Sequence, residues 1–371
     1  MHEMKTPLSF LEIKKRKKRK TKKMFRVLSI DGGGIRGIIP AKILALLEEE
    51  LGRKGKSTRI CDYFDMICGT STGGIIAIGL GLGMPANDIL NLYLENAEDL
   101  FPKKSFKRKM CNVIRGKSFY ERDVLKRLIA KAYDEAAKES PARLGHSHTR
   151  LCIPAYDAHK GAMHVFKTCH HPELIRDYQI PAADIALSTA AAPVYFDSYD
   201  FNCSPIGGGQ KISYSNLIDG GIMANNPALI GYTEAVHSLE IPVGDLAILS
   251  LGTGNNQLRD LPRTLSAKYW LYENKKFRLY DLTSSAQADY TSNLMKFLQK
   301  GVGNSGKQMF IYDRLQHPFC NRDEIGMDDS TPLSLDRLEK IGQELFGDHA
   351  TAMLSTYFQK IKEPFEPYSK L

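Results

Sequence analysis

Residues 25–37 read Phe-Arg-Val-Leu-Ser-Ile-Asp-Gly-Gly-Gly-Ile-Arg-Gly, and they set the pattern for the chain that follows. The apolar run 25–30 predicts a buried strand, and the glycines of 31–37 predict a loop. A helix is expected over 38–51, since Pro40 is tolerated in a first turn and Gly52 marks a stop. The order is therefore strand, glycine loop, helix.

The same order recurs directly afterwards, with a strand expected over 63–68 and a helix over 71–82. Strands that alternate with helices are typical of a parallel sheet with both faces covered. The sequence therefore predicts an α/β fold with a central, mostly parallel sheet. Further helices are predicted at 86–99, 119–138, 181–192, 227–239, 264–300 and 333–362, and further strands at 150–156, 162–168, 216–218 and 246–251.

The chain divides by composition into a short tail and a body. Nine of the 51 Lys and Arg residues lie in residues 14–23, so the other 42 are balanced by 42 Asp and Glu. We expect residues 1–23 to form a flexible polybasic tail, 24–254 a catalytic domain, and 255–371 a mainly helical extension packed on it. A neutral body argues against binding of a nucleic acid polymer.

The seven cysteines include no Cys-x-x-Cys pair, and no signal peptide is recognisable. Reduced thiols and a cytoplasmic location are therefore expected. Residues 66–87 carry no charge, but glycines and a Thr-Ser-Thr stretch interrupt them. A buried core helix is expected there rather than a membrane span.

The segment Gly69-Thr70-Ser71-Thr72-Gly73 matches Gly-x-Ser-x-Gly between a predicted strand and a predicted helix. This context is typical of a nucleophile elbow, in which flanking glycines relieve a strained turn and expose the serine hydroxyl. A Gly/Ser-rich turn without chemistry is the plainer interpretation. We favour Ser71 as a nucleophile.

The loop 31–37 has two interpretations. Gly32, Gly34 and Gly37 fit the dinucleotide-binding spacing Gly-x-Gly-x-x-Gly. A dinucleotide-binding site requires an acidic residue at the end of the second strand, and this chain has none there. Consecutive glycines also free several backbone N–H groups to point at one oxygen, as an oxyanion hole requires.

A serine nucleophile needs a base, and Asp219, in Asp219-Gly220-Gly221, supplies a carboxylate after an apolar pair. One alternative is an α/β-hydrolase triad, which would need a histidine after Asp219: His237, His317 or His349. Another is a nucleotide-binding module that uses the glycine loop, with Ser71 structural.

Four motifs in this order resemble the patatin-like phospholipase family: the loop 31–37, the elbow 69–73, Ala-Ala-Pro-Val-Tyr-Phe at 191–196, and Asp-Gly-Gly at 219–221 followed by Asn-Asn-Pro at 225–227. The resemblance covers residues 25–254.

It implies a lipid acyl hydrolase with a Ser-Asp dyad and no histidine, in which Ser71 is the nucleophile and Asp219 its base. It also implies an oxyanion hole of Gly33 and Gly34, with Arg36 assisting. No metal or organic cofactor is implied.

The opening 25–34 also looks similar to bacterial patatin-like effectors of antiphage (CBASS) signalling, in which a cyclic dinucleotide switches on a phospholipase. That resemblance implies a cyclic dinucleotide activator and a phospholipid substrate on the inner face of the membrane, with peripheral attachment. The basic run 14–23 suits an anionic membrane surface, with a nuclear-localisation or nucleic-acid signal as a lesser alternative. The aromatic-basic stretch 264–281 suits a membrane-interface lid or a nucleotide site. A solvated leader and an amphipathic helix packed on the core are the plainer interpretations, and a homo-oligomer is left open.

Overall fold

The structure is a computed structural model that describes residues 24–103, 106–256, 278–301, 308–320 and 324–371. The predicted tail 1–23 and the predicted helical segment 264–277 lie outside these ranges. The division into a domain at 24–254 and an extension at 255–371 stays a prediction.

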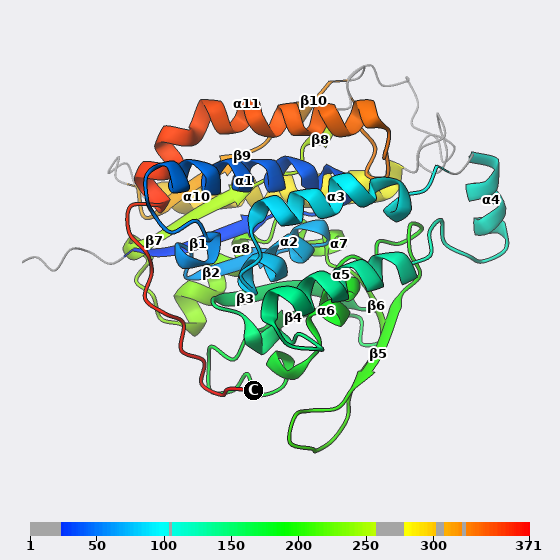
Figure 1. The fold of residues 1–371 in the computed structure, drawn as a ribbon, viewed down its shortest axis with the longest axis horizontal. Coiled ribbons are helices and arrows are strands. Elements are labelled where there is room, and N and C mark those ends of the chain that lie inside the picture. The colour runs from blue at the N-terminus through cyan, green and yellow to red at the C-terminus, as the bar shows by residue number, and fades with distance from the viewer. Residues whose placement is uncertain (1–23, 104–105, 257–277, 302–307, 321–323) are drawn as a thin grey trace, which may run out of the picture.

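A central sheet runs through the molecule in the order β5-β6-β3-β2-β1-β7-β9, with β4 paired to β3 (Figure 1). Strands β3, β2, β1, β7 and β9 are parallel to one another. Strands β4 and β6 each pair antiparallel with β3, and β5 pairs antiparallel with β6. The predicted mostly parallel sheet is confirmed. Its strands are β1 Phe25–Ile30, β2 Met66–Gly69, β3 Arg150–Asp157, β4 Ala162–Lys167, β5 Tyr199–Cys203, β6 Ile212–Asp219, β7 Leu246–Leu251 and β9 Ile311–Leu315. A separate two-stranded pair joins β8 Asn255–Asn256 and β10 Pro318–Phe319.

Helices cover both faces of the sheet, as predicted. They are α1 Ile38–Arg53, α2 Thr72–Gly81, α3 Ala86–Leu100, α4 Phe106–Ile114, α5 Asp123–Ala137, α6 Ala182–Thr189, α7 Gly221–Ala224, α8 Ala228–Thr233, α10 Arg278–Lys300 and α11 Pro332–Tyr357.

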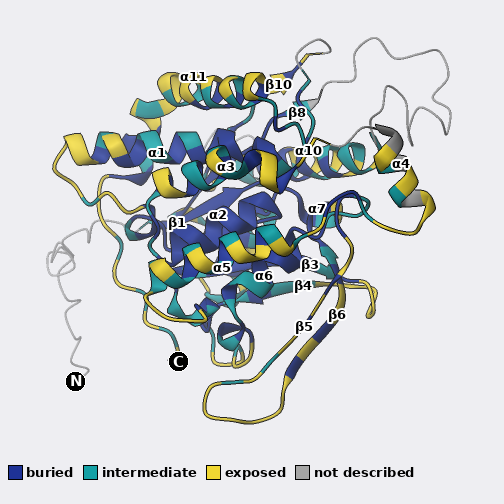
Figure 2. Ribbon diagram, turned by 45° about the vertical axis from the view of Figure 1, so that its right-hand side comes forward, coloured by how far each residue is buried: buried dark blue, intermediate teal, exposed yellow. Residues whose placement is uncertain are grey.

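Strand β1 shows why both faces must be covered, since all six of its residues are buried. Leu28 and Ile30 enter the larger core, which α1, α2, α3 and α11 share, whereas Phe25 and Val27 enter a smaller core on the opposite face with α8 and α10. Side chains alternate between the faces of a strand, so both faces of β1 must be apolar. Figure 2 shows the result: a buried sheet between helices that are exposed on their outer sides.

The fold brings the ends of three strands together. Ile30, the last residue of β1, is paired with Gly69, the last residue of β2. On the far side of β2, Asp219 ends β6 opposite Ala155 of β3. The glycine loop, the serine turn and the aspartate therefore follow neighbouring strand ends, where ligands bind in open α/β sheets.

Several elements differ from expectation, and α4, α7, β8 and β10 are among those not predicted. The helix predicted at 227–239 is α8 followed by a π-helical turn, Glu234–Ser238. Strands β5 and β9 were not predicted, and β9 brings residues 311–315 into the central sheet beside β7. None of the helices in the described ranges is both long and apolar enough to cross a membrane. All ten residues of α2 are buried, so α2 is the core helix expected within 66–87.

Candidate active site

Ser71 occupies a strained turn between β2 and α2. Its backbone has φ 55° and ψ −125°, a conformation that residues other than glycine rarely adopt. A side chain on Gly69 would begin 2.0 Å from the Gly73 carbonyl oxygen, and one on Gly73 would begin 2.2 Å from that of Ile30. The two glycines of the motif are therefore sterically required, as in a nucleophile elbow.

Neighbouring groups hold this turn in place. The Ser71 N–H donates to Thr189 Oγ1 at 3.0 Å, and Thr70 Oγ1 donates to the Ala224 carbonyl at 2.6 Å. Thr189 Oγ1 in turn donates to the carbonyl of Pro154 in β3 at 2.5 Å. The strained serine is thus fixed by hydrogen bonds to three other elements.

The glycine loop lies directly beside the serine. A side chain on Gly32 would begin 3.1 Å from the Ser71 Cβ atom. The N–H of Gly32 donates to Asn225 and that of Ile35 to Met327, whereas no hydrogen bond from the N–H of Gly33 or Gly34 occurs within the described residues. These two amides are the predicted oxyanion donors, and they remain available.

Gly34 needs to be glycine for two reasons. Its φ is +58°, and a side chain there would begin 2.2 Å from the Met327 carbonyl oxygen. Gly34 also lines the same cavity as Ser71. The loop is therefore held tightly between the serine and the segment that contains Met327.

Arg36 supports this loop from behind. It is 2% exposed, its backbone N–H and its Nε both donate to the Gly33 carbonyl, at 3.2 and 3.4 Å, and it does not line the cavity. The C=O of Gly33 and the N–H of Gly34 share one planar trans peptide, so they point in opposite directions. By holding the carbonyl, Arg36 orients the Gly34 N–H towards the other side. This arrangement favours an indirect role for Arg36.

Asp219 is fully buried. Its Oδ1 accepts the N–H of Gly221 at 2.6 Å, and its Oδ2 is buried without a hydrogen bond among the described residues. Burial raises the pKa of Asp219 to about 6, against opposing contributions from the Ser71 hydroxyl, the Gly221 N–H and the Tyr280 hydroxyl. Ser71 therefore faces the carboxylate, although the full Ser71–Asp219 hydrogen bond is not formed, as is common before substrate binds. With a pKa close to neutral pH, the Asp219 carboxylate can accept the proton of a hydroxyl group.

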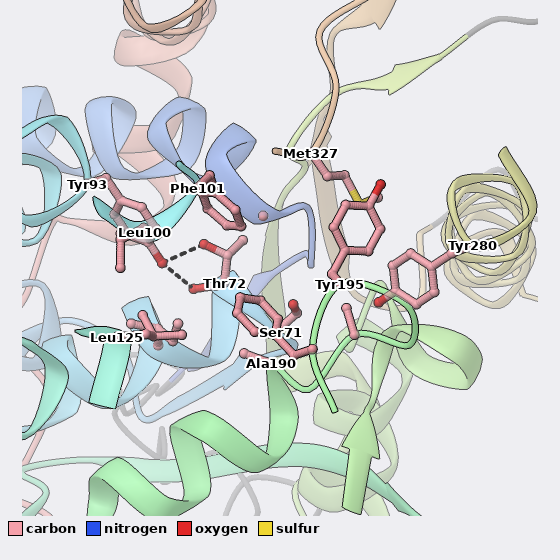
Figure 3. Close-up of a pocket in the computed structure, with 14 residues that line it drawn as sticks. Ser71, Thr72, Tyr93, Leu100, Phe101, Leu125, Ala190, Tyr195, Tyr280 and Met327 are labelled. Atoms are coloured by element: carbon pink, nitrogen blue, oxygen red, sulfur yellow. Dashed lines mark hydrogen bonds between the residues drawn. The ribbon is translucent and has the colours of Figure 1, made fainter. Parts of the chain in front are cut away.

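A small apolar cavity of about 50 Å³ opens at Ser71 (Figure 3). Ala190, Ala192, Tyr195 and Phe196, from the predicted motif and the residue before it, form part of its wall. This volume is about a third of the ~150 Å³ of an engineered cavity that binds benzene, so we expect the cavity to widen when it takes up a hydrocarbon chain. The other lining residues are Gly34, Thr72, Ile75, Tyr93, Leu100, Phe101, Leu125, Tyr280 and Met327.

The alternatives from the sequence find less support. His237 and His349 are exposed, on the π-helical turn and on α11, and His317 stacks on Phe319. None of the three lines the cavity or contributes to the pKa of Asp219. The glycine loop is covered by Met327, which leaves little room for a pyrophosphate at Gly34. No group of three His, Cys, Asp or Glu side chains in the described ranges could hold a metal ion.

Sequence reasoning missed three residues that lie at the site. Met327 contacts the glycine loop, Tyr280 lies at the Asp219 carboxylate, and Arg314 of β9 pairs with Asp31. All three come from the segment after residue 254. In the sequence, Tyr280 is only one of several aromatic residues of the stretch 264–281. No local pattern marks Met327 or Arg314, because their roles depend on contacts between residues distant in sequence.

A family model and curated relatives match this chain over most of its length. The model of a family described as "Patatin-like phospholipase" matches residues 28–232. "Patatin-like protein 2" of Arabidopsis thaliana is 34% identical over 353 residues, which cover 86% of this chain and 82% of that protein. A "cGAMP-activated phospholipase" of Escherichia coli is 31% identical over 331 residues, with 86% and 88% covered. Among solved structures, VipD from Legionella pneumophila aligns with 88% of this chain and 67% of that chain, with a TM-score of 0.41 and 13% identity.

Proposed function

This chain belongs to the patatin-like phospholipase family, and on that premise we propose that it is a lipid acyl hydrolase that cleaves membrane phospholipid esters with Ser71 and Asp219. The observation that carries the proposal is the strained Ser71 turn, which opens into an apolar cavity and faces a buried carboxylate. Apolar walls suit an acyl chain, and the serine at the cavity suits attack on the carbonyl that the chain carries.

In the first half-reaction, Ser71 Oγ attacks the ester carbonyl carbon and its proton passes to Asp219. The N–H groups of Gly33 and Gly34 stabilise the oxyanion, and the tetrahedral intermediate collapses when the C–O bond to the lipid alcohol breaks. Asp219 returns the proton to that alcohol. In the second half-reaction, water attacks the acyl-serine ester and gives a proton to Asp219. The C–O bond to Ser71 Oγ then breaks, Asp219 returns the proton to that oxygen, and the fatty acid is released.

A carboxylate is a weak base for a hydroxyl group, so the site must compensate. Burial of Asp219 raises its pKa to about 6, which brings its basicity closer to that of a histidine. Ser71 is buried and the cavity walls are apolar, and such low-polarity surroundings strengthen the interaction of the two amides with the oxyanion. These features support a dyad without histidine.

We also propose that a cyclic dinucleotide activates the enzyme. Relatives named cGAMP-activated phospholipases, from Escherichia coli and Pseudomonas aeruginosa, are 31% and 30% identical and cover 86% and 87% of this chain. The small cavity is consistent with low activity before activation, since an activator must bind an open state more tightly to populate it. A role in antiphage defence, at the inner face of the cytoplasmic membrane, belongs to the same proposal.

The test is release of fatty acid from phospholipid vesicles by the purified full chain, with and without a panel of cyclic dinucleotides. We expect low basal release, a large rise with one dinucleotide, and no release by Ser71→Ala. Equal rates with and without every dinucleotide would contradict the activation, and release by Ser71→Ala would contradict the hydrolase mechanism.

A further inference from the structure

Tyr280 reaches the active site from a segment distant in sequence. It lies in the first turn of α10, which packs against α7, the short helix that begins two residues after Asp219. Its ring packs edge-to-face on Tyr195, with ring centres 6.2 Å apart. Figure 3 shows the two rings side by side next to Ser71.

The Tyr280 hydroxyl lies at the carboxylate of Asp219. The point where a side chain on Gly221 would begin is 2.8 Å from the Tyr280 hydroxyl oxygen and 3.0 Å from Asp219 Oδ1. Glycine at 221 is therefore what lets the tyrosine approach. Burial raises the pKa of Tyr280 well above its ordinary value, so the phenol keeps its proton and can only donate to a carboxylate.

Only one of the two Asp219 oxygens has a hydrogen bond among the described residues. The Gly221 N–H donates to Oδ1 at 2.6 Å, while Oδ2 has no partner. The hydroxyls of Tyr280 and Ser71 both face this carboxylate, and the Tyr280 hydroxyl oxygen lies in the same space over Gly221 as Oδ1. An unpartnered buried carboxylate oxygen is costly unless a donor arrives.

The groups that face the carboxylate carry no formal charge. They are Ser71 before α2, the Gly221 N–H of α7 and Tyr280 of α10, and its strand neighbour in β3 is Ala155. Asp281, beside Tyr280, acts on the tyrosine and does not contribute to the pKa of Asp219. Neutral donors are thus what opposes burial at this carboxylate.

We propose that Tyr280 is a positioning residue of the reaction: its hydroxyl holds Oδ1 of Asp219, so that Oδ2 stays turned towards Ser71 and ionised when the serine attacks. This inference rests on the proposed dyad and adds a third residue to it. If Tyr280 has this role, a residue of the segment after 254 orients the base of the reaction.

The test is the pH profile of kcat/KM for a soluble short-chain ester, measured on the full-length wild type and on Tyr280→Phe. Asp219 must be ionised to act, so the rate falls as pH drops through its pKa. Loss of one donor raises that pKa. We expect the acid limb of Tyr280→Phe to move up by about one pH unit, as for one lost hydrogen bond to a charged group.

Tyr290→Phe is the matched control, because Tyr290 lies on the same helix and is 68% exposed. It should retain the wild-type profile. Should Tyr280→Phe fail to fold by circular dichroism, 3,5-difluorotyrosine incorporated at position 280 keeps the shape and donates more strongly. That protein should move the acid limb to lower pH.

An acid limb unchanged in both Tyr280 variants would overturn the proposal. So would a Tyr280→Phe enzyme that is faster at every pH, which would make Tyr280 a gate instead. Ser71→Ala is assayed in parallel: if it is active, the dyad itself is wrong, whereas an inactive Ser71→Ala beside an unchanged Tyr280→Phe profile rejects only the role of Tyr280.

Discussion

Arg314 of β9 binds both carboxylate oxygens of Asp31, with Nη1 2.8 Å from Oδ1 and Nη2 2.5 Å from Oδ2. Nη1 also donates to Ser250 Oγ of β7 at 3.0 Å. Asp31 is 1% exposed and comes directly before the glycine loop. A strand near the C-terminal end of the chain thus anchors the start of the glycine loop.

Arg314→Met should destabilise the protein strongly, because burial already raises the pKa of Asp31 and the arginine opposes that effect. Breaking a buried pair from one side costs about 3–5 kcal/mol. Urea unfolding measures the loss. Lys340→Met, which breaks the exposed pair with Asp336, is the control and should leave the stability nearly unchanged, since exposed ion pairs contribute little.

Adding Asp31→Asn to Arg314→Met should recover part of the lost stability, since no uncompensated charge is then buried. A double variant less stable than Arg314→Met alone would show that the pair is not what stabilises β9 against the loop.

Gly34→Ala should lower kcat by about 10²–10³-fold, as for the loss of one oxyanion donor. The added methyl group would meet the Met327 carbonyl and displace the loop. Gly55→Ala is the control, because Gly55 also has a positive φ, +63°, with no atom within 4 Å of the new methyl position. It should lose stability and keep kcat; if both variants lose kcat equally, a general backbone effect explains the result.

Asp219→Asn should be inactive and yet more stable than the wild type near neutral pH. The pKa of Asp219 is about 6 in the folded protein against an ordinary 3.8, so the folded state favours the protonated form. As pH rises from about 4 to about 6, ionisation of Asp219 therefore lowers the free energy of unfolding of the wild type by about 2–3 kcal/mol. The asparagine variant has no such loss. Urea unfolding at about pH 4 and pH 7 measures it, and an equal difference at both values would refute the raised pKa.

Leu125→Trp should alter the preference for acyl chain length. Leu125 lines the cavity on the side away from Tyr280 and Met327 (Figure 3), so a larger side chain there shortens the available space. We expect kcat/KM for long-chain esters to fall at least tenfold relative to a short-chain ester, since one methylene in an apolar pocket accounts for about 1–3 kcal/mol. Equal losses for all chain lengths would place the acyl chain elsewhere.

The sequence allowed prediction of the parts that are local. Residues 25–30 form a strand because a continuous apolar run suits burial on both faces, and Ser71 lies in the expected turn because glycines at 69 and 73 permit it. The parallel sheet followed from the repeated strand-loop-helix order.

The parts that could not be predicted depend on distant contacts. Strand β9 contains Asp313 and Arg314, which argue against a buried strand until the pairing of Arg314 with Asp31 is known. Tyr280 has no motif around it, and its position follows from the packing of α10 on α7. The raised pKa of Asp219 follows from complete burial, which a turn sequence such as Asp-Gly-Gly does not indicate.

The most direct test of the central claim is mass-spectrometric peptide mapping of the full-length protein after reaction with a fluorophosphonate, which modifies activated serines. We expect one phosphonylated residue, Ser71, and a strongly reduced rate of labelling in Asp219→Asn, whose circular dichroism should match the wild type. Labelling at another serine, or labelling of Ser71 at the same rate in Asp219→Asn, would contradict that claim.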